Sequence, residues 1–475
     1  MNGSDGFEQF LIGALALAVV AFATLTAGHA LLYKRDTRAV IGWVGFIILV
    51  PLAGAILYWM LAVNRVRRRA FAMRQHAQPP GRTAAAVAAS PPARLRPLAR
   101  VGDQVSPFPL CGGNLVEPLE NGDEAFPPML AAIDGARESI ALSTYIFDND
   151  EIGARFRDAL VAAHERGVAV RVIVDAVGQH YSWHSMVKQL RAKGVAAAAF
   201  MPILVPKNMA VLNLRNHRKL LIVDGCDTFT GGMNIRAGHV MAKPCKHPVR
   251  DLQFHVRGPI VAQLMDVFVS DWAFVTGERL GGQDWFPPLE TAGPVLARTI
   301  PDGPDEHFEI VKMVMLAALA QATDTVRIVT PYFLPDAALI SALNTAALRG
   351  VRVDILLPEQ NNLRMVQWAS FAHYWQMLER GCRIWHSPPP FDHSKLMLVD
   401  DVWTLVGSTN WDPRSLRLNF ELNTECYDAD LHARLAAWFD RRREVAREVT
   451  FSEVENRGLA RRLRDGAARL LSPYL

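Results

Sequence analysis

The sequence has few of the residues that would indicate a disulfide scaffold or a metal site. Its 475 residues include five cysteines, which lie far apart and never in a Cys-x-x-Cys pair. This spacing argues against a disulfide framework and against a zinc ribbon. Cys245 and the nearby His239, His247 and His255 match no standard set of metal ligands. We therefore predict no metal site and expect no cofactor.

A strong excess of positive charge is also missing. The formal net charge is +4, and charged residues make up 21% of the chain. A near-neutral chain does not produce the electrostatic field that attracts nucleic acids, so we expect no nucleic-acid partner. The length allows two or three domains with a large buried core.

Charged residues are absent from two long apolar runs near the amino end, about residues 10–33 and 39–63. A helix rises about 1.5 Å per residue, so each run is long enough to cross a hydrocarbon core of about 30 Å. Asp5 and Glu8 precede the first run, which argues against a signal peptide. The sequence therefore predicts a two-helix transmembrane hairpin over residues 1–70, with a kink at Pro51 in the second span.

The distribution of basic residues predicts the side of the membrane on which the rest of the chain lies. Five arginines follow the second span closely, whereas the connection between the spans has Lys34, Arg35 and Arg38. The positive-inside rule then places the body in the cytoplasm, attached to the inner (cytoplasmic) membrane by a multi-pass anchor. The arginines would also lie against anionic head groups.

Two stretches of the chain repeat one pattern. Each has a histidine followed by a lysine, an aspartate and an asparagine at offsets of two, seven and seventeen residues. The first copy is His217, Lys219, Asp224 and Asn234, and the second is His393, Lys395, Asp400 and Asn410. One H-x-K-x4-D match is weak evidence, but two copies in step indicate a duplicated structural unit. We predict that the two copies form one catalytic site.

The apolar neighbours of each motif alternate as in a buried strand, so the histidine and lysine should share a face. Asp224 and Asp400 lie an odd number of residues from their histidines, where strands should end in turns. We interpret each aspartate as holding a turn rather than orienting the imidazole. For that second role we predict Glu421 in the second half and Asp251 in the first, although the offset of Asp251 is less regular.

Two imidazoles, two ammonium groups and two amides suit a reaction at a phosphodiester. A neutral imidazole can attack phosphorus, and a protonated one can supply the proton that an alkoxide leaving group needs. The lysines would place positive charge beside the equatorial oxygens. No group of Asp and Glu typical of magnesium sites accompanies either motif. The pattern predicts phosphoryl transfer without a metal.

The rest of the chain predicts an α/β protein. Residues 71–109 are rich in Pro, Ala and Arg, as linkers are. A β-α-β pattern over residues 140–175 recurs over 326–357, which favours parallel strands covered by helices. We predict domains at 110–290 and 291–475.

Two segments have open interpretations. The aromatic face formed by Trp368, Phe371 and Trp375 fits core packing or an acyl-chain groove. The apolar segment 200–214 fits a lipid-facing loop.

These motifs resemble the phospholipase D superfamily and, more narrowly, bacterial cardiolipin synthases with an amino-terminal membrane hairpin. The resemblance covers nearly the whole chain. It includes Lys34-Arg35-Asp36, Thr144-Tyr145-Ile146-Phe147, Thr330-Pro331-Tyr332-Phe333, Asp412-Pro413-Arg414-Ser415 and Asn419-Phe420-Glu421. It implies two pseudo-twofold-related α/β sandwich domains with the active site between them. It also implies that one phosphatidylglycerol gives its phosphatidyl group to another, which yields cardiolipin and glycerol.

The resemblance further implies roles for individual residues. His217 would be the nucleophile that forms a phosphatidyl-histidine, and His393 would be the acid and base. Asn234 and Asn410 would bind phosphate oxygens, and Ser408 adds a hydroxyl that the first copy lacks at the matching position. The implied partners are phosphatidylglycerol and anionic membrane lipids. A membrane-anchored phospholipase D that hydrolyses phospholipids would use the same residues, with water as the acceptor.

Overall fold

The computed structural model describes residues 3–34, 37–59, 90–178, 185–201, 214–304 and 307–472. The chain folds as two compact units, Met1–Arg69 and Ala70–Leu475. Most of the segment 200–214, interpreted above as a lipid-facing loop, lies outside the described residues.

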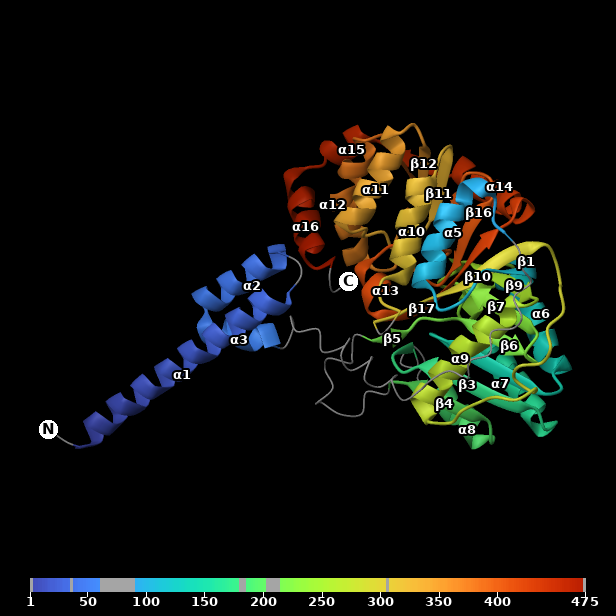
Figure 1. Ribbon diagram of the computed structural model, residues 1–475, viewed down its shortest axis with the longest axis horizontal. Helices are drawn as coiled ribbons and strands as arrows, with labels where there is room; N and C mark the ends of the chain where they lie inside the picture. The colour runs from blue at the N-terminus through green and yellow to red at the C-terminus, as the bar shows by residue number, and fades with distance from the viewer. Residues whose placement is uncertain are drawn as a thin grey trace. The chain divides into compact units, whose positions relative to one another are not determined.

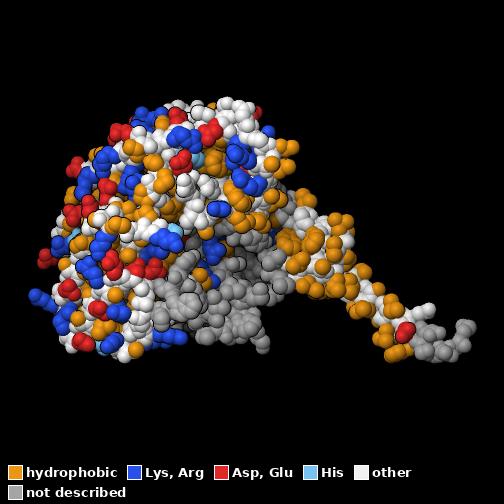
Figure 2. Space-filling view, turned by 180° about the vertical axis from the view of Figure 1, so that it is seen from behind, with side chains coloured by type: hydrophobic (Ala, Val, Ile, Leu, Met, Phe, Trp, Pro, Cys, Tyr) orange, Lys and Arg blue, Asp and Glu red, His pale blue; other side chains and the backbone are white. Residues whose placement is uncertain are grey.

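The amino-terminal unit begins with a long apolar helix, α1 (Gly3–Tyr33). Among the described residues it is the one helix long and apolar enough to cross a membrane, by length and composition over Phe7–Tyr33. Its surface is apolar along most of its length (Figure 2), with side chains such as Leu17 and Leu32 exposed. This helix corresponds to the first predicted span.

The second predicted span is not one continuous helix. Its described residues form α2 (Thr37–Leu49) and α3 (Pro51–Leu57), which are separated at Val50. Pro51 causes this break, because proline disfavours a helical conformation at the preceding residue. Each piece is shorter than the roughly 20 residues that a crossing helix needs. Over the described residues, the second predicted span is therefore interrupted at the predicted kink, and its last residues, 60–63, lie outside the described residues.

The three helices of this unit pack together through polar as well as apolar contacts. The Tyr58 hydroxyl lies 2.8 Å from Nδ1 of His29, and the Trp59 indole N–H donates to Oγ1 of Thr26 at 3.0 Å. A Cβ at Gly54 would lie 2.8 Å from Cα of Ile47, so only glycine allows α2 and α3 to approach this closely. The end of α3 is thereby held against the second half of α1.

The body contains one continuous mixed sheet whose strand order repeats about its centre (Figure 1). The order is β18-β13-β12-β11-β15-β16-β17-β10-β1-β9-β7-β6-β2-β3-β4. The first-half strands are β1 (Cys111–Glu120), β2 (Ser139–Thr144), β3 (Ala169–Asp175), β4 (Ala196–Phe200), β6 (Leu220–Val223), β7 (Asp227–Gly231) and β9 (Leu252–Arg257). The second-half strands are β10 (Val295–Asp302), β11 (Thr325–Val329), β12 (Arg352–Pro358), β13 (Arg383–Ser387), β15 (Leu396–Val399), β16 (Trp403–Gly407), β17 (Asn419–Tyr427) and β18 (Arg447–Val449). The two halves meet where β1 pairs antiparallel with β10.

Helices cover the sheet in the same way in each half. The first half has α6 (Asn121–Gly135), α7 (Glu151–Glu165), α8 (Met186–Ala192) and α9 (Ile260–Thr276). The second half has α10 (Ile310–Gln321), α11 (Ala337–Leu348), α12 (Arg364–Leu378), α13 (Pro413–Arg417), α14 (Ala429–Glu444), α15 (Phe451–Glu455) and α16 (Leu459–Leu470). Asp150 caps α7 and Asp336 caps α11, each by accepting two backbone N–H groups. The matching caps reflect the duplication.

Alternation along the strands directs side chains toward helices on both faces of the sheet. Val326 and Ile328 of β11 belong to the core beneath α10 to α12. Arg327 between them reaches Asp440 of α14, at 3.7 Å, on the opposite face. The predicted α/β sandwich of two pseudo-twofold-related halves is therefore present in the body.

Part of the predicted linker is folded. Residues 93–105 form a short 3-10 helix (Ala93–Leu95) and α5 (Arg96–Val105). Leu95, Leu98 and Ala99 are buried in the core of the second half. The linker prediction fails here because a single short helix needs only a few apolar residues, and the surrounding Pro, Ala and Arg conceal them.

Candidate active site

Each H-K-D motif is tied to the other half of the body by a two-residue parallel bridge. In the first, β5 (Arg215–Asn216) pairs with β17, and the backbone N–H of His217 donates to the carbonyl oxygen of Phe420 at 2.9 Å. In the second, β14 (Phe391–Asp392) pairs with β8 (Val249–Arg250), and the N–H of His393 donates to the carbonyl oxygen of Arg250 at 2.8 Å. The motif histidines and lysines thus precede β6 and β15 instead of lying within those strands.

The two bridges bring the histidines together at the junction of the halves. The ring centroids of His217 and His393 are 6.3 Å apart. Both side chains are largely buried, with 7% and 8% of their surface exposed. Their separation leaves room for one phosphorus centre between the imidazoles.

Each imidazole is oriented by a carboxylate of the opposite half. Nδ1 of His217 lies 2.9 Å from Oε2 of Glu421, and Nδ1 of His393 lies 2.8 Å from Oδ2 of Asp251. We had predicted both carboxylates, but each for the histidine of its own half, and that assignment is wrong. The reason is the pairing of the bridges, since β5 runs beside β17 and β14 runs beside β8.

The two carboxylates occupy equivalent positions in the fold. Gly231 pairs with Gln253 in the first half, and Gly407 pairs with Asn423 in the second. Asp251 and Glu421 each stand two residues before those partners. The offset from Asn234 to Asp251 is longer than that from Asn410 to Glu421 because the loop between β7 and β9 is longer than the one between β16 and β17. The longer loop does not change the pairing of the strands.

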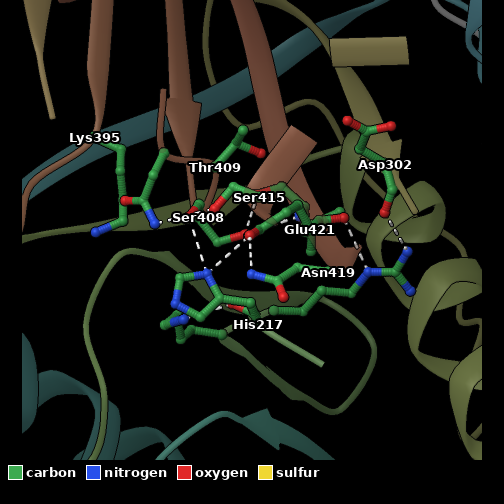
Figure 3. A network of polar contacts seen from close by, with 12 residues as sticks. His217, Asp302, Lys395, Ser408, Thr409, Ser415, Asn419 and Glu421 are labelled. Atoms are coloured by element: carbon green, nitrogen blue, oxygen red, sulfur yellow. Dashed lines mark hydrogen bonds and ion pairs between the residues drawn. The ribbon is translucent and has the colours of Figure 1, made fainter. Parts of the chain in front are cut away.

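The hydrogen bonds around His217 form a closed network (Figure 3). Oε2 of Glu421 also accepts from the Ser408 hydroxyl, and Oε1 accepts from Nδ2 of Asn419 at 3.1 Å. The carbonyl oxygen of Ser408 is a second acceptor for Nδ1 of His217, at 3.1 Å. With Nδ1 donating in this way, the lone pair of Nε2 is the part of the ring that can react.

The position equivalent to Ser408 must be glycine in the first half. A Cβ at Gly232 would lie 2.3 Å from Oδ1 of Asp251. In the first half, the shorter side chain of Asp251 therefore lies against the backbone of Gly232. In the second half, the longer side chain of Glu421 contacts the hydroxyl of Ser408 instead. The two histidines consequently have different surroundings.

The motif lysines lie beside the histidines and are also buried. Nζ of Lys219 donates to the carbonyl oxygen of His217 at 2.6 Å, and Nζ of Lys395 donates to that of His393. Burial, together with the charge of the other lysine, lowers the pKa of Lys219 to about 7. Burial likewise lowers the pKa of Lys395 to about 8, against the attraction of Asp251. An anion between them would restore the charged forms.

Without an anion at the site, both histidines are held neutral at neutral pH. Burial lowers the pKa of His217 to about 4, although the charge of Glu421 acts in the opposite direction. Burial and the charges of Lys395 and Lys219 lower the pKa of His393 well below its ordinary value. Burial raises the pKa of Asp251. Glu421 has a lowered pKa despite its burial, because His217 and Lys219 stabilise its charge.

The two predicted phosphate-binding asparagines are buried at the site but have different partners. Oδ1 of Asn234 accepts from the backbone N–H of Ile146 at 3.0 Å. Nδ2 of Asn410 donates to the hydroxyl of Ser415 at 3.1 Å, and its Oδ1 has no hydrogen-bond partner among the described residues. In this arrangement the side-chain amide of Asn234 is free to donate to a phosphate oxygen through Nδ2.

The motif aspartates Asp224 and Asp400 lie in turns outside the group of reacting side chains. The carboxylate of Asp224 accepts from the backbone N–H groups of residues 137–139, at 2.8 to 3.1 Å. That of Asp400 accepts from the equivalent groups of residues 323–325, at 2.8 to 3.2 Å. Both residues have positive φ, of 48° and 57°. This geometry agrees with our interpretation that they hold turns.

Comparison with known proteins adds the family. The family described as "Cardiolipin synthase, PLD-like domain" matches residues 129–272 and 315–443, which together are more than half of the chain. The chain belongs to this cardiolipin synthase family. The two matched segments contain the two H-K-D motifs, so the family relationship covers both halves of the site.

Relatives similar over the full length carry the same description. The chain is 30% identical over 481 residues to "Cardiolipin synthase" of Geobacillus sp. (strain WCH70), covering 99% of this chain and 96% of the relative. It is 31% identical over 486 residues to "Cardiolipin synthase A" of Pseudomonas syringae pv. syringae, covering 99% and 100%. A solved structure, phosphatidylserine synthase of Haemophilus influenzae, is 16% identical with a TM-score of 0.62, covering 80% of this chain and all of the other. That likeness concerns the fold alone.

Two tyrosines of this cardiolipin synthase family member flank the histidines, and the sequence analysis assigned them no role at the site. The ring of Tyr145 lies 5.2 Å from that of His217, and the ring of Tyr332 lies 6.2 Å from that of His393, between centroids. Both lie in the segments that follow β2 and β11, at residues 144–147 and 330–333, although their positions in these segments differ by one residue. The recurrence of a tyrosine there is a signal that could have identified them. A second missed feature is the buried ion pair of Arg218 with Asp271, at 2.6 Å, directly beside the first motif.

Two of the three histidines considered as possible metal ligands, His239 and His255, are engaged elsewhere. Nδ1 of His239 lies 2.9 Å from the carbonyl oxygen of Val249, and Nε2 of His255 bonds Oδ1 of Asp227 at 2.5 Å. Over the described parts of the chain, no group of three His, Cys, Asp or Glu side chains is arranged to hold a metal ion.

Changing Asp400 or Asp224 to asparagine should reduce stability more than catalysis. Each change removes a charged acceptor from several backbone donors, which should cost about 1–3 kcal/mol. Burial would raise the pKa of Asp400, but hydrogen bonds from Thr323 to Thr325 outweigh it and lower the pKa. Its contribution to stability is therefore full above an unfolded-state pKa of about 3.9 and is lost as pH falls through the lower folded-state pKa.

The measurement is the apparent melting temperature at several pH values, with Asp401→Asn as control. Asp401 is adjacent and 75% exposed, so its loss should have little effect. A normal melting temperature combined with a large loss of turnover would contradict the turn-holding role.

Proposed function

We propose that this protein is a phosphatidylglycerol-dependent cardiolipin synthase, in which one site at the junction of the halves transfers a phosphatidyl group to a second phosphatidylglycerol. The observation that carries the proposal is the pair of buried histidines, each oriented by a carboxylate of the opposite half. Relatives that match 99% of the chain are described as cardiolipin synthases.

In the first step, Nε2 of His217 attacks phosphorus and the bond from phosphorus to the glycerol oxygen breaks. His393 must hold a proton at this stage, which the negative charge of the bound phosphodiester favours, and it gives that proton to the departing glycerol. In the second step, His393 takes a proton from a hydroxyl of the second phosphatidylglycerol, whose oxygen attacks phosphorus and breaks the bond to His217. Lys219 and Lys395 balance the charge of the equatorial oxygens in both transition states.

The assignment of His217 as nucleophile rests on the difference between its carboxylate partner and that of His393. Glu421, with its lowered pKa, is firmly ionised, and its charge makes the imidazole of His217 more basic. Asp251 has a raised pKa, and the four largest charge effects on His393 all lower the pKa of that imidazole. The more basic imidazole is the better nucleophile, and the less basic one forms the stronger acid.

Hydrolysis by water is the alternative outcome at the same phosphoenzyme. The low exposure of both histidines favours transfer to a lipid alcohol, because a buried intermediate is protected from bulk water.

For location, we propose attachment to the bacterial inner membrane through α1. The apolar length of α1 and the arginines at 65, 67, 68, 69 and 74 support a body on the cytoplasmic side.

The decisive test is product analysis of the purified, detergent-solubilised protein with phosphatidylglycerol as the sole lipid. Cardiolipin and glycerol in equal amounts are expected, and EDTA should not change the rate. The His217→Ala variant is the control for contaminating activity. Formation of phosphatidic acid without cardiolipin would contradict the proposed synthase activity and indicate a phospholipase D.

The pH dependence of kcat/KM should have two limbs. Activity requires neutral His217, with a pKa of about 4, and charged Lys219, with a pKa of about 7. The rate should therefore rise through about pH 4 and fall above about pH 7, as the ammonium group loses its proton. In Lys219→Arg the charge is permanent, so the alkaline limb should move to higher pH even if the maximum rate is lower. An alkaline limb at the same pH would show that another group is responsible.

A further inference from the structure

Helix α16 carries an apolar stripe on its solvent side. Leu459, Leu463 and Leu470 are 71%, 65% and 75% exposed. With 3.6 residues per turn, the three side chains lie on one face of the helix. The face that packs on the body holds Asp465 and Ala468. The leucines are therefore on the opposite side from that expected of a helix covering a core.

The attachment of α16 to the body does not involve these leucines. Asp465 forms an ion pair with Arg457, at 2.7 Å. The guanidinium of Arg457 lies 4.1 Å from the ring centroid of Phe371, and that of Arg464 lies 4.5 Å from the ring of Trp368. Both rings belong to α12, beside which α16 lies (Figure 1). The stripe is therefore available while the helix stays fixed to α12.

Positive charge without an ion-pair partner borders the stripe on one side, at Arg462 and Arg469, whereas Arg461 lies on the opposite side of the helix. Arg461, Arg462 and Arg469 form no ion pair with any carboxylate of the described residues. Asp465 is the one acidic residue of α16, and it is already paired with Arg457 and Arg464. The outer surface of α16 thus combines leucines with uncompensated guanidinium groups.

A recess beside α16 has the same mixed character. It has a volume of about 400 Å³ and lies between α12, α15 and α16. Its lining includes the aromatic side chains Phe371, Trp375 and Phe451. Three arginines and two carboxylates also line it, Arg457, Arg462, Arg469, Glu455 and Asp465, so positive charge exceeds negative charge. The aromatic face was interpreted above as core packing or as an acyl-chain groove, and the structure shows some of each. Phe371 packs against the core, whereas Trp375 is 45% exposed. Guanidinium groups bind phosphate oxygens in bidentate fashion, and aromatic rings accept apolar chains.

We propose that α16 and this recess form a docking surface for the anionic phospholipids of a bilayer, separate from the catalytic site. The helix would lie in the plane of the membrane, with its leucines below the head groups and its arginines against the phosphates. A second copy of the chain fits less well, because a twofold contact would place the same arginines opposite one another. The apolar helix α1 offers a way of keeping the bilayer near the body.

A short series of packed side chains connects the docking surface to the catalytic site. Ala468 belongs to an apolar cluster against which Tyr332 packs, and the ring of Tyr332 is 6.2 Å from that of His393. A docked α16 would hold the second half of the site near the membrane surface. The docking inference itself does not depend on which phosphodiester reacts.

The test uses the full chain in nanodiscs, with a fluorophore at Ala467→Cys. Cys226→Ser and Cys245→Ser remove the exposed thiols, and Ala467 is an exposed residue of α16 outside the leucine set. In discs containing phosphatidylglycerol, the emission should shift to the blue and rise about twofold, and a nitroxide on the lipid tails should quench it. A label at Ser341→Cys, exposed on α11, is the matched control and should stay solvated.

Two sets of variants separate the contributions. Changing the three leucines to serine should abolish quenching without changing the melting temperature, because these side chains are exposed. Changing Arg462 and Arg469 to glutamine should remove the difference between discs with and without phosphatidylglycerol. An equal response in pure phosphatidylcholine would overturn the anionic-lipid assignment. A label that stays solvated, or responds only with two copies per disc, would overturn docking to the bilayer.

Discussion

His217→Ala and His393→Ala should each reduce cardiolipin formation by at least about 10,000-fold, because the two imidazoles perform successive parts of one reaction. Their ring centroids are 6.3 Å apart in a common buried site, so neither half can complete turnover alone. The measurement is the initial rate of product formation by purified variants with equal melting temperatures. His255→Ala is a suitable control, since His255 bonds Asp227 and makes no contact with the site. Full activity in either motif variant would contradict the shared site.

A substrate with a good leaving group should separate the two roles. In a phosphatidyl ester of p-nitrophenol, the departing phenolate needs no proton, so the general acid becomes unnecessary. His393→Ala should then release nitrophenol and accumulate phosphatidyl-histidine at His217, which acid quenching and mass spectrometry can detect. His217→Ala should remain inactive with this substrate. The opposite pattern would exchange the roles of nucleophile and acid.

The residues of the candidate site could be predicted from the sequence because they are duplicated. His, Lys, Asp and Asn recur at equal offsets, and chance does not reproduce three spacings together. The turn role of Asp224 followed from the period of two along a strand. These predictions used local information, which the sequence carries in full.

The crossing of the two halves at the site could not be predicted in the same way. It depends on β5 pairing with β17 and on β14 pairing with β8. Strands of two residues are too short to show any periodic pattern, and each pairs with a distant segment. The sequence therefore identified Glu421 and Asp251 but assigned each to the wrong histidine.

The second apolar run shows a different limit. Its length and composition are those of a membrane span, but neither shows whether the helix is continuous. The effect of Pro51 on Val50 is local and was foreseen as a kink. The consequence, two short helices brought close at Gly54, depends on packing that apolarity alone does not specify.

Glu421→Gln and Asp251→Asn should each lower turnover by about 100- to 10,000-fold, in the range seen when the carboxylate orienting a catalytic histidine is replaced by an amide. Both changes keep the size of the side chain and remove the charge that stabilises the Nδ1–H tautomer. Ser408→Ala removes one donor to Glu421 and should have a smaller effect, of about tenfold.

The nitrophenyl substrate distinguishes crossed from uncrossed carboxylates. If Glu421 acts through His217, Glu421→Gln should impair the attacking imidazole, and its defect should persist with the activated leaving group. If Asp251 acts through His393, Asp251→Asn should impair proton delivery, and the activated leaving group should restore most of the rate. Carboxylates serving the histidines of their own halves would give the reverse pattern. Because the wild-type chain reports the intrinsic effect of the leaving group, rescue is measured relative to it, and equal rescue of both variants would exclude separate roles for the two histidines.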